Sequence, residues 1–402
     1  MSAGRTHSLR ALPAGVWALG FGSLFMDMSS ELIHALLPLY LVTVLHTPMA
    51  TVGLLEGIAE ATAAITKVFS GALSDYIGRR KPLVILGYGL ATLTKPVFPL
   101  ATGLSWIFGA RFLDRVGKGI RGAPRDALVA DITPEGQRGA AYGLRQALDS
   151  VGALAGPALA IALTAGLGFG LRAAMWVAVV PAAITVLLLI TYVREPAGTD
   201  TQTRRWRSPL ARAALRELPA RYWAIVALSA VFTMARFSEA FLVLRAQDAG
   251  LPMGYVPLVM VVMNLIYATL SYPAGAWADR RGTRMPLLLG LAVLVIADIL
   301  LALVATPAGV LAGAALWGLH LALTQGLLST LVADRAPAQL RATAFGIFNL
   351  VSGLALLLAS TLAGQLWGTV GPAATFLAGG AFAALAALSV ALMRPARPQP
   401  GA

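Results

Sequence analysis

Three ionisable residues near the start of the chain, Asp27, Glu31 and His34, have a spacing that suits metal binding or proton transfer. At steps of four and three residues they fall along one stripe of a helix. Glutamate and histidine three residues apart can share a metal ion inside a helical bundle, and imidazole with carboxylate suits nickel, zinc or cobalt. The stripe predicts a metal site of Asp27, Glu31 and His34, with His34 as a plain hydrogen-bonding residue as the alternative.

Two further acids, Glu56 and Glu60, are four residues apart, and Lys67 follows on the same stripe. Neighbouring buried carboxylates repel each other and lose hydration, so one of them is expected to hold a proton. An acid that is neutral when dry and ionised when its side of a cavity opens converts a pH gradient into a conformational bias. A static network of ion pairs is the alternative. The candidates for proton coupling are Asp27, Glu31 and Glu56.

Composition indicates that these residues lie in membrane helices. Of the 402 residues, 58% are hydrophobic and 12% are charged, and the mean hydropathy is +0.75. Soluble proteins average about 45–50% apolar and 25% charged residues. The absence of G-x-S-x-G, H-E-x-x-H and P-loop patterns argues against an enzyme and against ATP as the direct energy source, and no cofactor is expected. With no Cys, disulfides and thiolate metal sites are excluded.

Apolar runs and their breakers predict twelve membrane helices, because about 20 residues cross the hydrocarbon core. The predicted helices are 16–45, 51–73, 83–102, 105–124, 139–167, 172–193, 222–244, 254–277, 286–305, 309–332, 342–367 and 372–393.

Basic residues of the connections predict the orientation of these helices. Nearly all fall on one side of the layout, and Arg172 and Arg245 fall on the other. Orientation follows Lys and Arg in short loops, so both termini are expected in the cytoplasm. The net charge of +13 is then a topology signal and does not indicate nucleic-acid binding. The expected setting is the plasma (inner) membrane of a bacterium, with a monomer that contacts lipid, protons and a small-molecule or ion substrate.

The sequence repeats itself at an offset of about half its length. Residues 71–80 read GALSDYIGRR and residues 275–284 read GAWADRRGTR, and LVAD at 128–131 recurs at 331–334. The repeat predicts two six-helix bundles, 1–193 and 222–402, joined by a polar cytoplasmic linker, 194–221. Such bundles suit rocking about a central site, which a pore does not need.

Over essentially the whole chain these features resemble the major facilitator superfamily, whose fold is an all-α membrane fold of twelve helices in two pseudo-symmetric halves. The repeated loops are similar to its signature between helices 2 and 3 and the copy between helices 8 and 9. The resemblance implies a cytoplasmic charge latch that holds the outward-facing state. A carboxylate at a helix N-terminus gains about 0.3–1 kcal/mol. A tight loop that only sets topology is the alternative. The latch residues are Gly71, Asp75, Gly78, Arg79, Arg80, Gly275, Asp279, Gly282 and Arg284.

A second resemblance lies in residues 139–167, where glycines and a proline follow the spacing G-x8-G-x3-G-P of the antiporter branches. Ala160 and Ile161 stand where the family has two glycines. The match implies export and a gating role for this helix, with ordinary close packing as the alternative. The residues that match are Gly143, Gly152, Gly156 and Pro157.

In the fourth helix, Arg115 and Gly119 resemble an R-x-x-Q-G motif whose arginine is tied to proton transfer, with Lys118 in place of Gln. Helices 1, 4, 7 and 10 line the superfamily's cavity. The resemblance therefore implies a substrate and proton site of Asp27, Glu31, His34, Arg111, Asp114, Arg115, Arg236, Glu239, Trp317, His320 and Gln325, with Glu56 and Glu60 from helix 2. Static pairs of Glu31 with Arg115 and of Glu239 with Arg236 are the alternative. Lys95 and Asp298 are expected at the periphery, where they snorkel or form structural pairs.

The resemblance implies secondary active transport by alternating access, with proton-coupled efflux of a small cationic or amphipathic solute or drug. Aromatic residues, among them Phe237 and Trp317, could line the pocket beside acids. The run SSELIHALLPLY also resembles an efflux branch with members linked to nickel resistance, so divalent metal efflux is an alternative. The histidine-rich tail of those relatives has no counterpart in residues 394–402. A non-transporting sensor or a channel is a further alternative.

Overall fold

The computed structural model describes residues 12–134, 136–195, 215, 217–337 and 340–392, and all regular structure in these residues is helical. Its first elements, here called the N-terminal group, are α1 (Ala14–Thr43), α2 (Met49–Ile77), α3 (Lys81–Thr94), α4 (Val97–Leu100), α5 (Leu104–Ile132), α6 (Arg138–Ile161), η2 (Ala162–Gly166), α7 (Leu171–Val177) and α8 (Val179–Tyr192). The C-terminal group contains α10 (Ala220–Met234), α11 (Ala240–Asp248), η3 (Met253–Tyr255), α12 (Leu258–Arg281), α13 (Arg284–Leu303), α14 (Pro307–Thr324), α15 (Leu327–Arg335), α16 (Arg341–Thr369) and α17 (Pro372–Leu392).

The all-helical membrane class predicted from composition is confirmed. Eight helical stretches of the described chain are long and apolar enough to cross a membrane. Helices α1, α2 and α5 are 29 or 30 residues long, which at about 1.5 Å per residue also exceeds the hydrocarbon thickness. Their ionisable residues lower their hydropathy, so the count of twelve spans stays a prediction.

Several predicted helices are interrupted. The stretch 222–244 is divided into α10 and α11 by residues 235–239, where the Ser238 N–H donates to Ser360 Oγ (3.1 Å) instead of to its own helix. The stretch 309–332 is divided at Gly326, whose φ of +83° is left-handed. In 83–102, Pro96 lies between α3 and α4 and lacks the N–H that would continue the helix.

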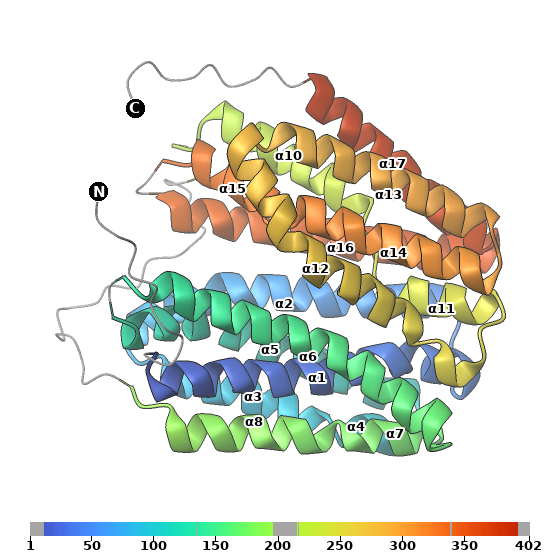
Figure 1. Ribbon diagram of the computed structural model, residues 1–402, viewed down its shortest axis with the longest axis horizontal. Coiled ribbons are helices and arrows are strands. Elements are labelled where there is room, and N and C mark those ends of the chain that lie inside the picture. Colours follow the sequence, from blue (N-terminus) through green and yellow to red (C-terminus); the bar gives the residue numbers. More distant parts are fainter. Residues whose placement is uncertain (1–11, 135, 196–214, 216, 338–339, 393–402) are drawn as a thin grey trace.

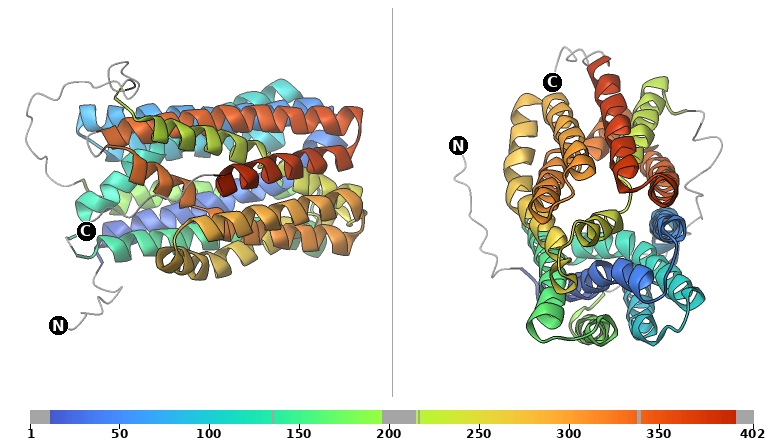
Figure 2. Two further views of the ribbon diagram at one scale, coloured as in Figure 1. Left: turned by 90° about the horizontal axis from the view of Figure 1, so that it is seen from above. Right: turned by 90° about the vertical axis from the view of Figure 1, so that its right-hand side faces the viewer.

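The two groups of helices lie against each other as two layers of long, roughly aligned helices (Figure 1). Figure 2 shows the same division in the end-on view. Helix α2 packs along α16, α6 packs along α12, and α1 contacts α11. The predicted linker, 194–221, lies mostly outside the described residues, so its boundaries stay a prediction.

Contacts between the groups close one end of the molecule, the end at which α1 finishes. There Asn264 Nδ2 of α12 donates to the Ala153 carbonyl of α6 (3.1 Å), and Thr164 Oγ1 donates to the Gly254 carbonyl (3.0 Å). At the other end, the last turns of α2 expose Tyr76 and other large apolar side chains. The two groups of helices diverge toward this end, where α1 begins (Figure 1).

An aromatic cluster fills the closed end beside the interruption between α10 and α11. The Phe237 ring centroid lies 5.7 Å from that of Phe241 and 5.5 Å from those of Trp317 and Phe376. Trp367 completes the cluster at 5.7 Å from Phe241. Burial of these rings stabilises the irregular backbone of 235–239, because aromatic side chains contribute large apolar areas and favourable edge contacts.

Candidate functional site

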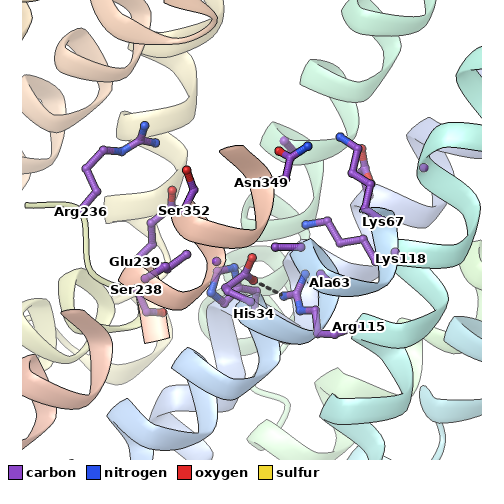
Figure 3. A pocket seen from close by; sticks show the side chains of 18 of the residues that line it. His34, Ala63, Lys67, Arg115, Lys118, Arg236, Ser238, Glu239, Asn349 and Ser352 are labelled. Carbon is purple, nitrogen blue, oxygen red and sulfur yellow. Dashed lines mark ion pairs between the residues drawn. The ribbon is translucent and has the colours of Figure 1, made fainter. Parts of the chain in front are cut away.

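A cavity of about 630 Å3 lies between the two groups of helices (Figure 3). Its walls come from α1, α2, α5 and α6 on one side, and from α10, α14, α16 and the segment 235–239 on the other. Charged side chains of both signs dominate the lining. The lining includes the predicted residues Asp27, Glu31, His34, Glu60, Arg115, Arg236, Glu239 and Trp317.

Asp27, Glu31 and His34 of α1 all line this cavity, and they have different partners. His34 Nδ1 lies 3.4 Å from Glu31 Oε2, and His34 Nε2 lies 3.9 Å from Glu56 Oε2. Asp27 has no ion pair within 4.0 Å among the described side chains. The charges that act most strongly on Asp27 belong to Asp149, Arg121, Arg125 and Lys118.

The predicted metal site is not formed in this conformation. Within the described ranges, no three His, Cys, Asp or Glu residues are grouped closely enough to hold a metal ion. Asp27 sits one helical turn from Glu31 and interacts with the basic residues of α5, whereas Glu31 and His34 interact with each other. A metal site at Asp27, Glu31 and His34 stays a prediction.

Ion pairs between helices join other predicted residues, of which Arg111 and Glu56 do not line the cavity while Arg115 and Glu60 do. Arg111 Nη2 lies 2.7 Å from Glu56 Oε2, and both side chains are almost completely buried. Arg115 Nη2 lies 3.3 Å from Glu60 Oε1, so Arg115 pairs with Glu60 and not with Glu31 as the static alternative assumed. These contacts join α5 to α2, and desolvated pairs of this kind are stable only when both partners are present.

Lys95 and Asp114 form a second buried pair behind the cavity. Their side chains are 1% and 5% exposed, the Nζ to Oδ1 distance is 2.9 Å, and Lys95 also donates to Ser30 Oγ (3.0 Å). Asp114 therefore joins α5 to α3 and does not line the cavity.

Asp298 on α13 is fully buried, yet neither carboxylate oxygen has a hydrogen-bond partner in the described structure, so the structural pair expected for it is not formed.

The C-terminal group contributes fewer charges to the cavity. Arg236 and Glu239 both belong to the segment 235–239, and both line the cavity. No ion pair within 4.0 Å joins them. His320 does not reach the cavity: its Nδ1 lies 2.8 Å from the Gly290 carbonyl oxygen, and its ring stacks on Phe232. Trp317, on the same helix, does line the cavity.

Several cavity residues were absent from the predicted site. Lys67 lies on the same stripe of α2 as Glu56 and Glu60, so the helical period could have predicted that it belongs to the site. Lys118 follows Arg115 by one turn in the same way. No local sequence pattern marked the remaining polar residues that line the cavity. These residues are Arg121, Arg125, Asp126, Asp149, Thr233, Ser238, Asn349 and Ser352.

The predicted latch residues make their contacts within one group of helices. Arg80 Nη1 lies 3.2 Å from Asp75 Oδ1, and Arg80 Nε lies 2.5 Å from Asp131 Oδ2. Arg284 Nη2 donates to the Ala391 carbonyl (2.6 Å). Gly78 ends α2 with a left-handed φ of +71°, and Gly282 follows α12 with a φ of +82°. Among the described residues, no ion pair links these loops across the two groups.

The glycines of α6 pack this helix against α1. A methyl group on Gly152 would lie 2.4 Å from the Leu24 carbonyl oxygen, and one on Gly156 would lie 2.7 Å from that of Met28. Gly143 has open space around it, and Pro157 lies inside α6. Close packing therefore accounts for two of the glycines, and it brings α6 beside the Asp27 and Glu31 turns of α1.

A membrane protein of two helical layers around a charged central cavity has the architecture of a transporter. Residues 19–263 and 240–402 match the family model of the Major Facilitator Superfamily. The chain belongs to this superfamily and is a secondary transporter, not an enzyme.

Similar proteins cover most of the chain. An uncharacterized MFS-type transporter of Methanocaldococcus jannaschii is 33% identical over 389 residues, 94% of each chain. The multidrug resistance protein MdtH of Photorhabdus laumondii is 23% identical over 282 residues, 68% of this chain and 66% of that one. Among solved structures, the nucleoside transporter NupG superposes with a TM-score of 0.79 at 14% identity, covering 94% of this chain and 98% of NupG, which shows a shared fold.

Proposed function

We propose that the chain is a proton-coupled exporter that moves a small cationic or amphipathic solute by alternating access. The observation that carries this proposal is the position of Asp27, a carboxylate at the cavity wall without an ion pair among the described residues. An acid that is not committed to a static pair is free to exchange its proton for a solute. Glu239, on the opposite wall, is a second acid of this kind.

The surroundings of Asp27 suit a proton that is linked to conformation. Its Cβ lies 3.1 Å from where a methyl group on Gly152 would be, so α6 passes directly beside it. The cavity gives it water on the open side of the molecule. When the open end closes, this water is excluded, and ionised Asp27 becomes more costly than neutral Asp27. A proton bound there therefore favours the closed arrangement, which couples a pH gradient to the helix movement.

A cationic group of the solute would compete with protons for these acids. Phe237 and Trp317, at the edge of the aromatic cluster, line the same cavity as Glu239 and Asp27. Cations gain from aromatic faces as well as from carboxylates. Competition between a proton and a cation for one carboxylate is the simplest basis for exchange of the two across the membrane.

The direction of transport rests on two resemblances. The glycine and proline spacing of α6 is similar to that of the antiporter branches, and MdtH, a relative over two thirds of the chain, is described as a multidrug resistance protein. Both favour export.

The proposed topology follows the distribution of Lys and Arg. We place twelve spans in two bundles, 1–193 and 222–402, with the linker 194–221 and both termini in the cytoplasm of a bacterium. In that orientation the cavity opens to the cytoplasm, because it opens at the end where α1 begins, and a solute can enter from there.

Divalent metal efflux receives less support from the geometry, because Asp27, Glu31 and His34 have different partners. A toxicity panel of metals and drugs in a deletion strain identifies the solute class. The panel is then repeated with His34→Ala, which a metal exporter would not tolerate.

Transport in inverted membrane vesicles tests proton coupling. Asp27→Asn is expected to abolish uptake driven by a pH gradient while leaving exchange of labelled solute largely intact. Glu31→Gln is expected to have a similar but smaller effect, since Glu31 already has His34 as a partner. Asp248→Asn is a matched control, because Asp248 pairs with Arg245 outside the cavity. Unchanged pH-driven uptake in Asp27→Asn would remove this residue from coupling, and voltage-dependent single-channel currents would show a channel instead.

A further inference from the structure

The charges that line the cavity are not balanced once the ion pairs are taken into account. Four of its acids already have basic partners: Glu31 with His34, Glu60 with Arg115, and both Asp126 and Asp149 with Arg145. Asp126 also lies 3.2 Å from Arg125. The acids left without a partner in the described chain are Asp27 and Glu239.

The unpaired bases of the cavity outnumber these two acids. No described acid lies within 4.0 Å of the basic groups of Lys67, Lys118, Arg121 and Arg236. Arg236 belongs to the segment 235–239. Lys67 lies on α2, and Lys118 and Arg121 lie on α5. The wall formed by α2 and α5 therefore carries three cations that have no described acid within 4.0 Å.

Packing holds two of these cations in place. The Lys67 side chain crosses from α2 to α5, and its Cε lies 3.7 Å from where a methyl group on Gly122 would be. Arg121 is 5% exposed, its guanidinium carbon lies 4.5 Å from the centre of the Tyr88 ring, and its Nη1 atom has no hydrogen-bond partner. This nitrogen is buried against α3, so Arg121 holds a positive charge just behind the cavity wall, and an anion in the cavity would offset that charge.

Helix α16 adds neutral hydrogen-bonding groups to the cavity. Asn349 and Ser352 of α16 line the cavity opposite α2 and α5. Figure 3 shows Lys67, Lys118 and Asn349 toward one side of the view, with Arg236, Glu239 and Ser352 toward the other. An anionic group on the side of Lys67, Lys118 and Asn349 could thus accept hydrogen bonds from ammonium and amide donors.

From this arrangement we infer an anion subsite formed by Lys67, Lys118 and Arg121, and hence a solute that carries a carboxylate, sulfonate or phosphate group in addition to its cationic part. This inference rests on the proposed function, because it assumes that the cavity holds the transported solute. The cationic part of a zwitterionic solute would face Asp27 or Glu239 and compete with protons there. The anionic part would neutralise the α2 and α5 wall, where like charges otherwise repel.

Binding of three matched probes to the purified protein in detergent tests the subsite. The probes are phenethylamine, hydrocinnamate and phenylalanine, which share an aromatic ring and carry a positive charge, a negative charge, or both. Hydrocinnamate and phenylalanine are expected to bind, as measured by calorimetry. Lys67→Gln and Lys118→Gln are each expected to weaken that binding about tenfold, the effect of one charge-assisted hydrogen bond. Lys81→Gln removes the same charge outside the cavity and is expected to leave binding unchanged.

The outcomes separate the subsite from the proposed function. The subsite would be overturned if phenethylamine alone bound. It would also be overturned if hydrocinnamate and phenylalanine bound with equal strength to Lys67→Gln, Lys118→Gln and Lys81→Gln. Neither result would contradict proton-coupled export. Failure of hydrocinnamate and phenylalanine to bind at millimolar concentration would also overturn the subsite. Lysine-dependent anion binding together with normal pH-driven uptake in Asp27→Asn would leave the subsite and remove the coupling role of Asp27. The same binding is then measured in nanodiscs of phosphatidylglycerol and of phosphatidylcholine. Weaker binding of hydrocinnamate in phosphatidylglycerol alone would assign the site to a lipid headgroup and not to a solute.

Discussion

Gly53 of α2 lies so close to Ser360 of α16 that a methyl group on Gly53 would be 2.2 Å from the Ser360 carbonyl oxygen. This contact belongs to the closed end of the cavity. Gly53→Leu is therefore expected to force α2 from α16. Overpacking costs about 1–3 kcal/mol, so the population of this conformation should fall about tenfold.

Spin labels measure that opening directly. The natural chain has no Cys, so Val44→Cys and Val370→Cys give one label at the closed end of each group of helices without background. The distance between the labels should increase in Gly53→Leu. It should not change in Gly109→Leu, where the added side chain has open space. An unchanged distance distribution in Gly53→Leu would contradict the role of this contact.

Asp75→Asn is expected to shift the resting state further toward the inward-facing form with little change in thermal stability. The Asp75 side chain is 72% exposed, and exposed ion pairs contribute about 0–1 kcal/mol. A latch that forms only in the outward-facing state would lose its carboxylate. The measurement is the rate at which an impermeant maleimide labels Ser352→Cys in the cavity from the cytoplasmic side. Equal rates with and without Asp75→Asn would argue against the latch.

Lys95→Met is expected to lower the thermal midpoint strongly, because it leaves buried Asp114 with only the more distant Arg115, whose Nε lies 4.0 Å from Asp114 Oδ2. Breaking one side of a buried pair costs about 3–5 kcal/mol. The double variant Lys95→Met with Asp114→Leu should recover most of the loss, since it removes both charges. Thermal unfolding in detergent measures both effects, and equal midpoints for the single variant and the natural protein would show that the pair contributes nothing.

Asp298→Asn is expected to leave the thermal midpoint unchanged or to raise it. Both oxygens of this fully buried carboxylate lack hydrogen-bond partners in the described structure, so the substitution removes a charge-bearing group without breaking a contact. A fall as large as that of Lys95→Met would reveal a partner for Asp298 in another conformation.

His34→Ala is expected to leave any binding of nickel or zinc unchanged, because no third ligand joins Glu31 and His34 in the described structure. Calorimetric titration of the purified protein and of His34→Ala, each after chelation, measures this. Binding that disappears in His34→Ala would restore the metal alternative.

Local periodicity and the distribution of charge were sufficient to predict the helical membrane class and the stripe of Asp27, Glu31 and His34, and the resemblance of the repeated loops pointed to the superfamily. These features depend on the sequence alone, because hydropathy along a helix and a step of three or four residues do not require a neighbour. The repeat of the loops around Asp75 and Asp279 was likewise visible in the residues themselves.

The partners of the buried charges were decided by tertiary structure. Arg115 faces Glu60 and Lys95 faces Asp114 because α5 packs against α2 and α3, and no local spacing encodes which helices meet. The interruption at 235–239 has the same origin, since Ser360 on a distant helix accepts a hydrogen bond that α10 would otherwise make internally. In a membrane a buried polar group must find a partner within the protein, so the side chains left free to act are known only when the helices have been assembled.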